Sequence, residues 1–181
     1  MSDLRKIGVF CSASSNVKEV YMTAAKEVGE YIGSNGRELV YGGSAMGMME
    51  VVAKAVKENG GKVTGVVPQV LMDKGAASKY IDHLIVCKDL TDRKSVMLEN
   101  SDIMIALPGG VGTLDEVFTV MAGVTLGYHK KRIIFYNTDG FWTTLTDYLN
   151  TLYKEHFIRN QPRQLYDVAD NLDELTRILN R

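Results

Sequence analysis

The run LPGGVGTLDE, residues 107–116, concentrates three glycines, a threonine hydroxyl and two carboxylates at one point of the chain. An apolar run at 103–107 leads into it, which indicates a corner between a strand and a helix. Glycine lets a ligand approach the backbone closely, and the free N–H groups at a helix start favour an anion. We therefore predict a phosphate-binding loop, made of Gly109, Gly110, Val111, Gly112 and Thr113.

The spacing of these glycines differs from two common phosphate motifs. No lysine followed by serine or threonine comes after them, as in a Walker A loop, and the pattern is not GxGxxG. A tight turn that only connects strand and helix is the structural alternative. We place Glu116 in the first helical turn, where a carboxylate beside a sugar phosphate activates water or stabilises a developing cation. Asp115 is interpreted as a solvated acid that stabilises the helix dipole.

The run TDRKSVML, residues 91–98, supplies positive charge. Arg93 and Lys94 lie early in an expected helix, where cations oppose the helix dipole, so a bound phosphate or carboxylate should compensate for them. Arg93 and Lys94 are therefore our candidates for binding that anion. The alternative is ordinary surface charge on a helix that is capped by Thr91 or Asp92.

Two further corners carry small or hydroxyl residues. In YGGSAMG, Gly42 and Gly43 permit a second phosphate or ribose corner, with Tyr41 stacking or donating; a plain glycine loop is the alternative. In CSASSN, Ser12 is our candidate hydroxyl donor, together with Ser14 or Ser15. The alternative is that this second run caps the next helix, through Ser15 or Asn16.

Short apolar runs alternate with helical periodicity along the chain, which favours a parallel sheet covered on both faces. The expected fold is therefore a doubly wound, Rossmann-like α/β domain over residues 1–181, with ligands outside the carboxyl ends of the strands. Residues 70–80 are expected to form a loop or a flap. The expected strands are 6–11, one within 35–43, 62–67, 81–87, 103–107 and 132–136, and the expected helices are 18–34, 48–59, 92–100, 112–126, 141–156 and 172–179.

Composition narrows the functional classes. The chain has 181 residues, enough for one domain, and a net charge of -1, which gives no general attraction to nucleic acid or to anionic membranes. It has no apolar run of roughly 20 residues and no signal-peptide core at its N-terminus. Cys11 and Cys87 end apolar runs, as small buried residues of a reducing compartment do, so we expect a cytoplasmic protein.

Metal and triad chemistry find little support in the pattern. No CxxC or HxxxH spacing suggests zinc, and His83, His129 and His156 are dispersed without partners for a catalytic triad. We therefore expect no metal and assign the histidines no catalytic role.

The sequence resembles the Lonely Guy (LOG) family, whose members are often labelled lysine decarboxylase-like. The segments that carry the resemblance are, in order, Tyr41-Gly42-Gly43, Arg93-Lys94 and the run PGGxGTxxE at 108–116. The resemblance covers nearly the whole chain, including VFCSASS and LGYHKKRIIFYNTDGFW. The PGGxGTxxE run is highly specific, and the other segments are individually weak.

The resemblance implies a Rossmann-like homodimer that hydrolyses the N-glycosidic bond of a nucleoside 5′-monophosphate, giving a free base and ribose 5-phosphate. Family substrates are cytokinin riboside 5′-monophosphates and often AMP. The family's essential arginine and glutamate fall on Arg93 and Glu116, its phosphate loop falls on residues 109–113, and helical residues 117–126 could supply a dimer seam. The chain carries no pyridoxal phosphate lysine motif, so the decarboxylase label lacks chemical support, and no cofactor is expected.

The sequence departs from the family at positions that lie near the base pocket or the dimer seam in relatives. Thr91 and Thr119 replace a frequent histidine or asparagine and a second glutamate, while Ala122-Gly123 and Gly75-Ala76 replace threonine-tryptophan and glycine-glutamate pairs. These departures leave the base preference open. A non-catalytic carrier of a nucleotide or of molybdenum cofactor is the alternative function, because related Rossmann-like binders share the glycine-rich loop.

Overall fold

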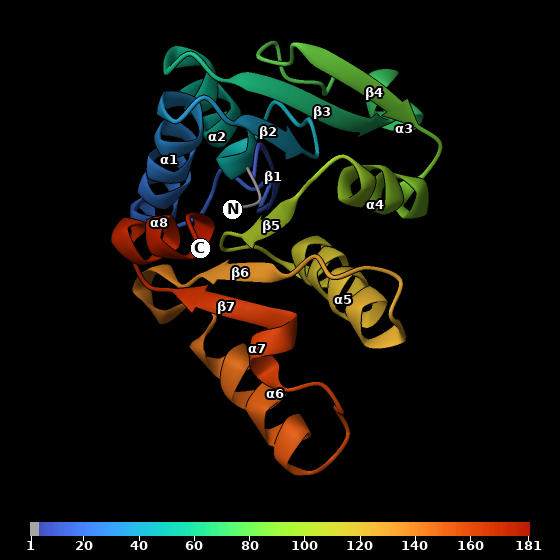
Figure 1. Ribbon diagram of the computed structural model, residues 1–181. Coiled ribbons are helices and arrows are strands. Elements are labelled where there is room, and N and C mark those ends of the chain that lie inside the picture. The colour runs from blue at the N-terminus through green and yellow to red at the C-terminus, as the bar shows by residue number, and fades with distance from the viewer. Residues whose placement is uncertain (1–3) are drawn as a thin grey trace.

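A sheet of parallel strands forms the centre of the computed structural model, which describes residues 4–181 (Figure 1). Within these residues the seven strands follow the order β4-β3-β2-β1-β5-β6-β7. Alternate side chains of β1 enter two different apolar clusters, since Ile7 and Val9 pack on one face and Phe10 on the other. The strands are β1 (Lys6–Phe10), β2 (Glu38–Tyr41), β3 (Lys62–Pro68), β4 (His83–Cys87), β5 (Ile103–Ala106), β6 (Ile133–Tyr136) and β7 (Tyr166–Ala169).

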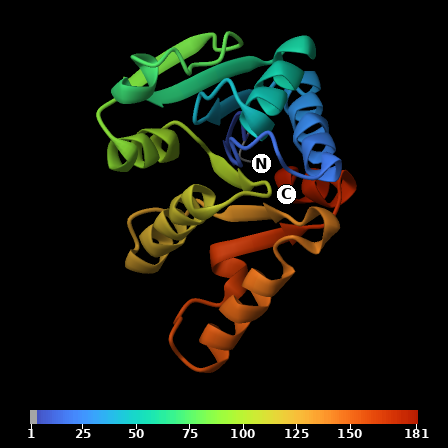
Figure 2. The ribbon, with the colours of Figure 1, turned by 180° about the vertical axis from the view of Figure 1, so that it is seen from behind.

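Helices cover both faces of the sheet, as the two opposite views show (Figures 1 and 2). One face carries α1 (Glu19–Ser34), α2 (Gly47–Glu58) and α8 (Leu172–Leu179). The other face carries α4 (Leu90–Glu99), α5 (Val111–Leu126), α6 (Thr143–Lys154) and α7 (Pro162–Leu165). The short α3 (Gln69–Met72) and the 3-10 turn η1 (Thr138–Gly140) belong to connections. The predicted doubly wound, Rossmann-like α/β fold is confirmed.

The chain order reverses between β1 and β5. From β1 the chain moves outward through β2 and β3 to β4, and it then returns to the opposite side of β1 as β5. The loops after β1 and β5 meet there, since the Ser12 N–H donates to the Pro108 carbonyl at 3.2 Å. Such a switch point leaves a crevice at the carboxyl ends of the strands, which is where ligands bind in sheets of this kind.

The expected strands and helices agree with the structure to within two residues at each end. Four short elements were missed, namely α3, α7, η1 and the edge strand β7, because three or four residues of mixed polarity show no period. The segment at 70–80, expected to be a loop or a flap, begins with part of α3. It is then tied to the loop after β2, because the Ala45 N–H donates to the Ala76 carbonyl and the Ser78 N–H to the Gly43 carbonyl, each at 2.9 Å.

The helix caps named in the two structural alternatives are not formed. Helix α4 is capped by Asp89, whose carboxylate accepts from the N–H groups of Thr91 and Asp92, so the helix begins earlier than expected. Helix α1 follows Lys18, without a side-chain cap. The serines before it bond within their own loop instead, where Ser12 Oγ accepts from the Ser14 N–H at 3.0 Å.

Candidate active site

A polar cavity of about 250 Å³ lies where the loops after β1 and β5 meet. It brings together the predicted catalytic residues, Arg93 and Glu116, with part of the predicted phosphate loop. The lining residues are Cys11, Ser12, Ala13, Met49, Arg93, Gly110, Gly112, Thr113 and Glu116. Its position at the switch point agrees with the rule for doubly wound sheets.

The start of helix α5 forms one wall of this cavity. Gly110 is the N-cap residue, and Leu114 is the first residue of the helix whose N–H reaches a helical acceptor, the Gly110 carbonyl at 3.0 Å. The N–H groups of the three residues before Leu114 have no acceptor in their own helix and carry the positive end of the helix dipole. A Cβ atom at Gly110 or Gly112 would meet no protein atom within 4 Å among the described residues, so the space before them is open to a ligand. This wall can bind an anion.

The remaining residues of the predicted loop contribute in different ways. At Gly109 a Cβ would overlap the side chain of Thr113, so the absence of a side chain here leaves room for the buried threonine. Gly109 itself lines an adjoining hollow of about 170 Å³, beside Tyr21 and Phe141. The side chain of Val111 is exposed, and this residue does not line the cavity.

Arg93 and Glu116 form a buried ion pair between two helices. Arg93 Nη2 donates to Glu116 Oε1 at 3.1 Å, and the two side chains are only 10% and 8% exposed. Glu116 lies in the second turn of α5, not in the first as predicted, and it stands four residues after Gly112, so both face the cavity. The Nε of Arg93 is buried and has no acceptor among the described residues, so the guanidinium retains donor capacity.

Burial sets the protonation of this site. It raises the pKa of Glu116 to about 7, against the opposing effect of the Arg93 charge, while Asp115 raises that pKa further and Lys94 lowers it. A carboxyl group with this pKa exchanges its proton near neutral pH, as a general acid or base requires. Burial also raises the pKa of Cys11 far above its usual range, so its thiol stays protonated and is not a nucleophile.

A second ion pair joins the same two helices outside the cavity. Lys94 Nζ lies 2.8 Å from both carboxylate oxygens of Asp115, and neither residue lines the cavity. The structure therefore does not bring Lys94 to the phosphate loop. Asp115 stands in the second turn of α5 and partners Lys94, which corrects its interpretation as a first-turn acid that acts only on the helix dipole.

The glycine corner after β2 also differs from its predicted role. Gly42 and Gly43 do not line the cavity, and Tyr41 is fully buried in the core, where it can neither stack on a ligand nor reach one. Gly43 has a φ of 74°, which makes the turn, and Gly42 lies against the guanidinium of Arg93.

Sequence reasoning missed Cys11, Ala13 and Met49 as lining residues. The first two flank the candidate Ser12, so their place in the loop after β1 was a usable signal, whereas nothing in the sequence marked Met49. No histidine lines the cavity. Across residues 4–181 no group of three or more His, Cys, Asp and Glu side chains is placed to hold a metal ion.

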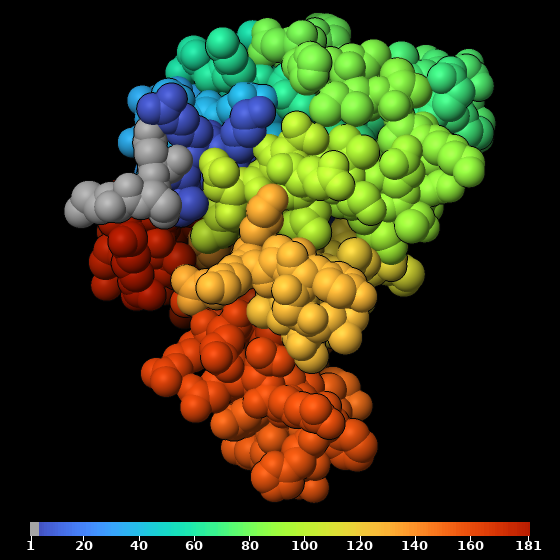
Figure 3. All heavy atoms as spheres, turned by 45° about the vertical axis from the view of Figure 1, so that its right-hand side comes forward, coloured from blue at the N-terminus to red at the C-terminus, as the bar shows by residue number. Residues whose placement is uncertain are grey.

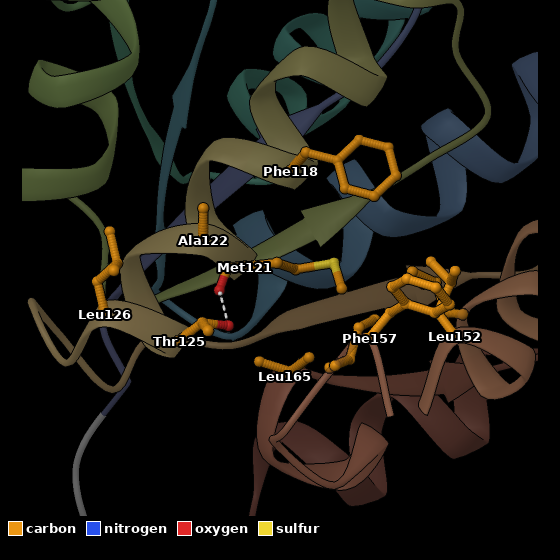
Figure 4. A pocket seen from close by; sticks show the side chains of 10 residues that line it. Phe118, Met121, Ala122, Thr125, Leu126, Leu152, Phe157 and Leu165 are labelled. Carbon is orange, nitrogen blue, oxygen red and sulfur yellow. Dashed lines mark hydrogen bonds between the residues drawn. The ribbon is translucent and has the colours of Figure 1, made fainter. Parts of the chain in front are cut away.

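A second hollow, about 490 Å³, is an apolar groove that lies away from these polar groups. One wall is the C-terminal half of α5, and the other comes from α6, α7 and the loop between them (Figure 4). This second wall belongs to the orange-red part of the chain, which projects from the body in Figure 3. Phe118, Leu126 and Phe157 are 42%, 64% and 79% exposed. The hydroxyl of Thr125 donates to the Met121 carbonyl at 3.1 Å, so the groove offers a ligand little but apolar surface.

Residues 49–179 match a family model described as "Possible lysine decarboxylase". The cytokinin riboside 5′-monophosphate phosphoribohydrolase LOG5 of Arabidopsis thaliana is 36% identical over 178 residues, which are 98% of this chain and 78% of that protein. The probable cytokinin riboside 5′-monophosphate phosphoribohydrolase LOGL2 of Oryza sativa subsp. japonica is 36% identical over 174 residues, 96% of this chain and 71% of that protein.

Among solved structures, the molybdenum cofactor (Moco) carrier protein from Chlamydomonas reinhardtii is similar, with a TM-score of 0.77 and 23% identity over 98% of this chain and 96% of that one. This likeness shows the fold alone. No helix within residues 4–181 is long and apolar enough to cross a membrane. With its PGGxGTxxE run at the start of α5 and a third of its residues shared with the plant phosphoribohydrolases over nearly its full length, the chain belongs to the LOG family.

Proposed function

We propose that this protein is a hydrolase that cleaves the N-glycosidic bond of a nucleoside 5′-monophosphate, giving a free base and ribose 5-phosphate. Cytokinin riboside 5′-monophosphate is the substrate that the names of the plant relatives state, and AMP is the simplest nucleotide of the same class. The observation that carries the proposal is the buried Arg93–Glu116 pair, which shares one cavity with the open start of α5.

The phosphate group would bind at the start of α5. The N–H groups of residues 111–113, the hydroxyl of Thr113 and the helix dipole favour a dianion there. Ser12 also lines this cavity and offers a further hydroxyl. Binding energy gained on the phosphate then holds the ribose beside the ion pair, so that a part of the substrate that does not react positions the bond that does.

Glu116 and Arg93 would act on the bond itself. As the C1′–N bond breaks, the sugar gains positive charge, which the ionised form of Glu116 stabilises. The same carboxylate accepts a proton from the water whose oxygen bonds to C1′, while the bonding electron pair leaves with the base, which takes up a proton from solvent to become the free base. Arg93 orients Glu116 and the nucleotide, and its remaining N–H donors assist the departing base.

The reaction is tested by incubating the pure protein with AMP or isopentenyladenosine monophosphate and measuring free base by chromatography. We expect release of base from at least one of them, and its loss in Glu116→Gln. Asp115→Asn is the matched control, because Asp115 is the neighbouring carboxylate but lies outside the cavity. Unchanged turnover in Glu116→Gln would remove the proposed role.

A non-catalytic carrier of a nucleotide or of molybdenum cofactor is the rival function. A carrier needs the anion-binding wall but has no use for an acid and a guanidinium that meet beside it. Binding of AMP measured by calorimetry, with no base released from either nucleotide over a long incubation, would favour the carrier. A melting temperature that does not respond to AMP or ribose 5-phosphate would count against both functions.

A homodimer is the proposed assembly, and the groove of Figure 4 is its proposed contact. Exposed Phe118, Leu126 and Phe157 form an apolar surface of the kind that protein interfaces bury. Light scattering of the full chain should give twice the monomer mass. Phe157→Ser should shift the protein towards monomer, whereas Tyr148→Ser, an exposed aromatic outside the groove, should not. A monomer in wild-type protein at micromolar concentration would refute this assembly.

We take residues 1–181 to act as one nucleotide-binding domain, of which residues 1–3 lie outside the described structure. The cytoplasm is the proposed compartment, since Cys11 and Cys87 are free and buried, as in a reducing environment. Fractionation of the native cells with detection of the protein would check this placement.

A further inference from the structure

Arg93 reaches Glu116 by passing directly over Gly42. The arginine begins on α4, which follows the edge strand β4, and the glutamate stands on α5, which follows β5. Gly42 comes immediately after β2, between those two strands in the sheet order. A Cβ atom built at Gly42 has the Nη2, Cζ and Nε atoms of Arg93 as its nearest neighbours. It would overlap Nη2 and approach the other two to 2.8 and 3.3 Å.

The backbone gives no other reason for glycine at this position. Gly42 is absent from the residues with positive φ, whereas its neighbour Gly43 has a φ of 74°. Alanine can therefore adopt the backbone conformation of Gly42, and what it cannot share is the space of the guanidinium. All three atoms nearest to the added methyl belong to one planar group, which is held at its far end by Glu116.

We propose that Gly42 is a positioning residue, whose missing side chain lets the guanidinium of Arg93 pass against the backbone after β2 and reach Glu116. This inference rests on the proposed function for its effect on catalysis. It replaces the predicted role of Gly42 in binding the substrate phosphate, since Gly42 does not line the cavity.

The obstruction should displace the arginine rather than unfold the chain. A guanidinium is the end of a flexible side chain and moves more easily than backbone. Its movement breaks the 3.1 Å contact with Glu116 and leaves a buried carboxyl group without its partner. We therefore expect Gly42→Ala to fold, to melt somewhat lower and to lose most of its turnover.

The test is a double-mutant cycle of Gly42→Ala and Arg93→Ala, read in melting temperature and in kcat for base release. Gly42→Ala should lower the melting temperature by roughly 3–10 °C in the wild-type background. In the Arg93→Ala background the same change should shift it by less than about 1 °C, because no guanidinium remains to obstruct. With Arg93 present, kcat should fall by about 100-fold, the effect of a displacement near 1 Å.

Gly65→Ala is the matched control. It lies on the neighbouring strand β3, and its added methyl would overlap the side chain of Ile81 instead of Arg93. It should lower the melting temperature in both backgrounds and change kcat by less than about twofold. Wild-type kcat in Gly42→Ala, or an equal melting loss with and without Arg93, would overturn the inference. The melting cycle needs no substrate, so failure of the proposed function, seen as no base release from wild-type protein, is distinguished from failure of this inference.

Discussion

Replacing Glu116 with glutamine should abolish turnover and at the same time stabilise the protein at alkaline pH. The carboxyl group is buried and its pKa is raised from an ordinary 4.5 to about 7, with burial as the largest cause. The charges that act on it are Arg93, which opposes the rise, then Asp115 and Lys94. Ionised Glu116 is therefore costly in the folded state even with Arg93 beside it.

The sign of the pH dependence follows from proton counting. Between about pH 4.5 and 7 the folded state keeps the proton of Glu116, whereas the unfolded state has lost it. The stabilisation from this group is thus fully present below about pH 4.5 and is lost as pH rises through about 7. Over that interval wild-type protein should lose about 3 kcal/mol of unfolding free energy through this single group. Glutamine has no proton to lose and escapes the loss.

Thermal or urea unfolding of wild type and Glu116→Gln at several pH values from 4.5 to 8 measures this effect. The difference between the two proteins should grow in favour of the variant by about 3 kcal/mol, or roughly 6–12 °C in melting temperature for a chain of this size. The comparison of the two proteins at the acidic end of the range is an internal control, because in the folded state residue 116 is uncharged in both of them there. A difference that stays constant across the range would refute the burial argument and, with it, the assignment of Glu116 as a proton acceptor near pH 7.

Three further outcomes are expected. In wild-type protein kcat/KM for base release should rise with pH through about 7, because the ionised form of Glu116 acts on the sugar and on water; a flat profile would contradict that role. Gly112→Ala should raise KM for AMP at least about tenfold, because its methyl group occupies open ligand space, and its melting temperature should stay within about 2 °C of wild type. Gly109→Ala should melt at a lower temperature, because its methyl group would meet the buried side chain of Thr113. Lys94→Met should change KM for AMP less than about threefold, since Asp115 holds that ammonium group; a tenfold rise would place it on the phosphate.

The sequence was sufficient for those features that local chemistry decides. An apolar run followed by PGG has few solutions other than a buried strand that turns sharply into a helix, and β5 and α5 form that corner. Parallel strands then force the corners after β1 and β5 to one edge of the sheet, which is why Ser12 and Gly110 share a cavity. The meeting of Arg93 with Glu116 was expected from the family resemblance, not from spacing.

What the sequence could not supply depends on distant partners. Lys94 and Arg93 are adjacent and both cationic, yet the way α4 packs beside α5 brings Arg93 to Glu116 in the cavity and Lys94 to Asp115 outside it. The requirement for Gly42 is set by a side chain 51 positions later, which no local rule relates to it. Strand β7 is recognisable only from the neighbour it pairs with, since four residues of mixed polarity carry no period of their own.

Helix α5 links the three surfaces that the proposed function needs. Its first turn offers N–H groups to the phosphate, its second turn carries Glu116, and its C-terminal half forms a wall of the apolar groove. A helix moves nearly as a rigid body, so a partner that covers Phe118 and Leu126 also restricts the helix on which Glu116 stands. Arg93 stands on α4. Its side chain contacts Glu116 through a single 3.1 Å hydrogen bond, which a displacement near 1 Å would break. Covering the groove would therefore bear on catalysis, because the Lys94–Asp115 pair, which also joins α4 to α5, has a half-exposed carboxylate and is too weak to hold the two helices in register alone.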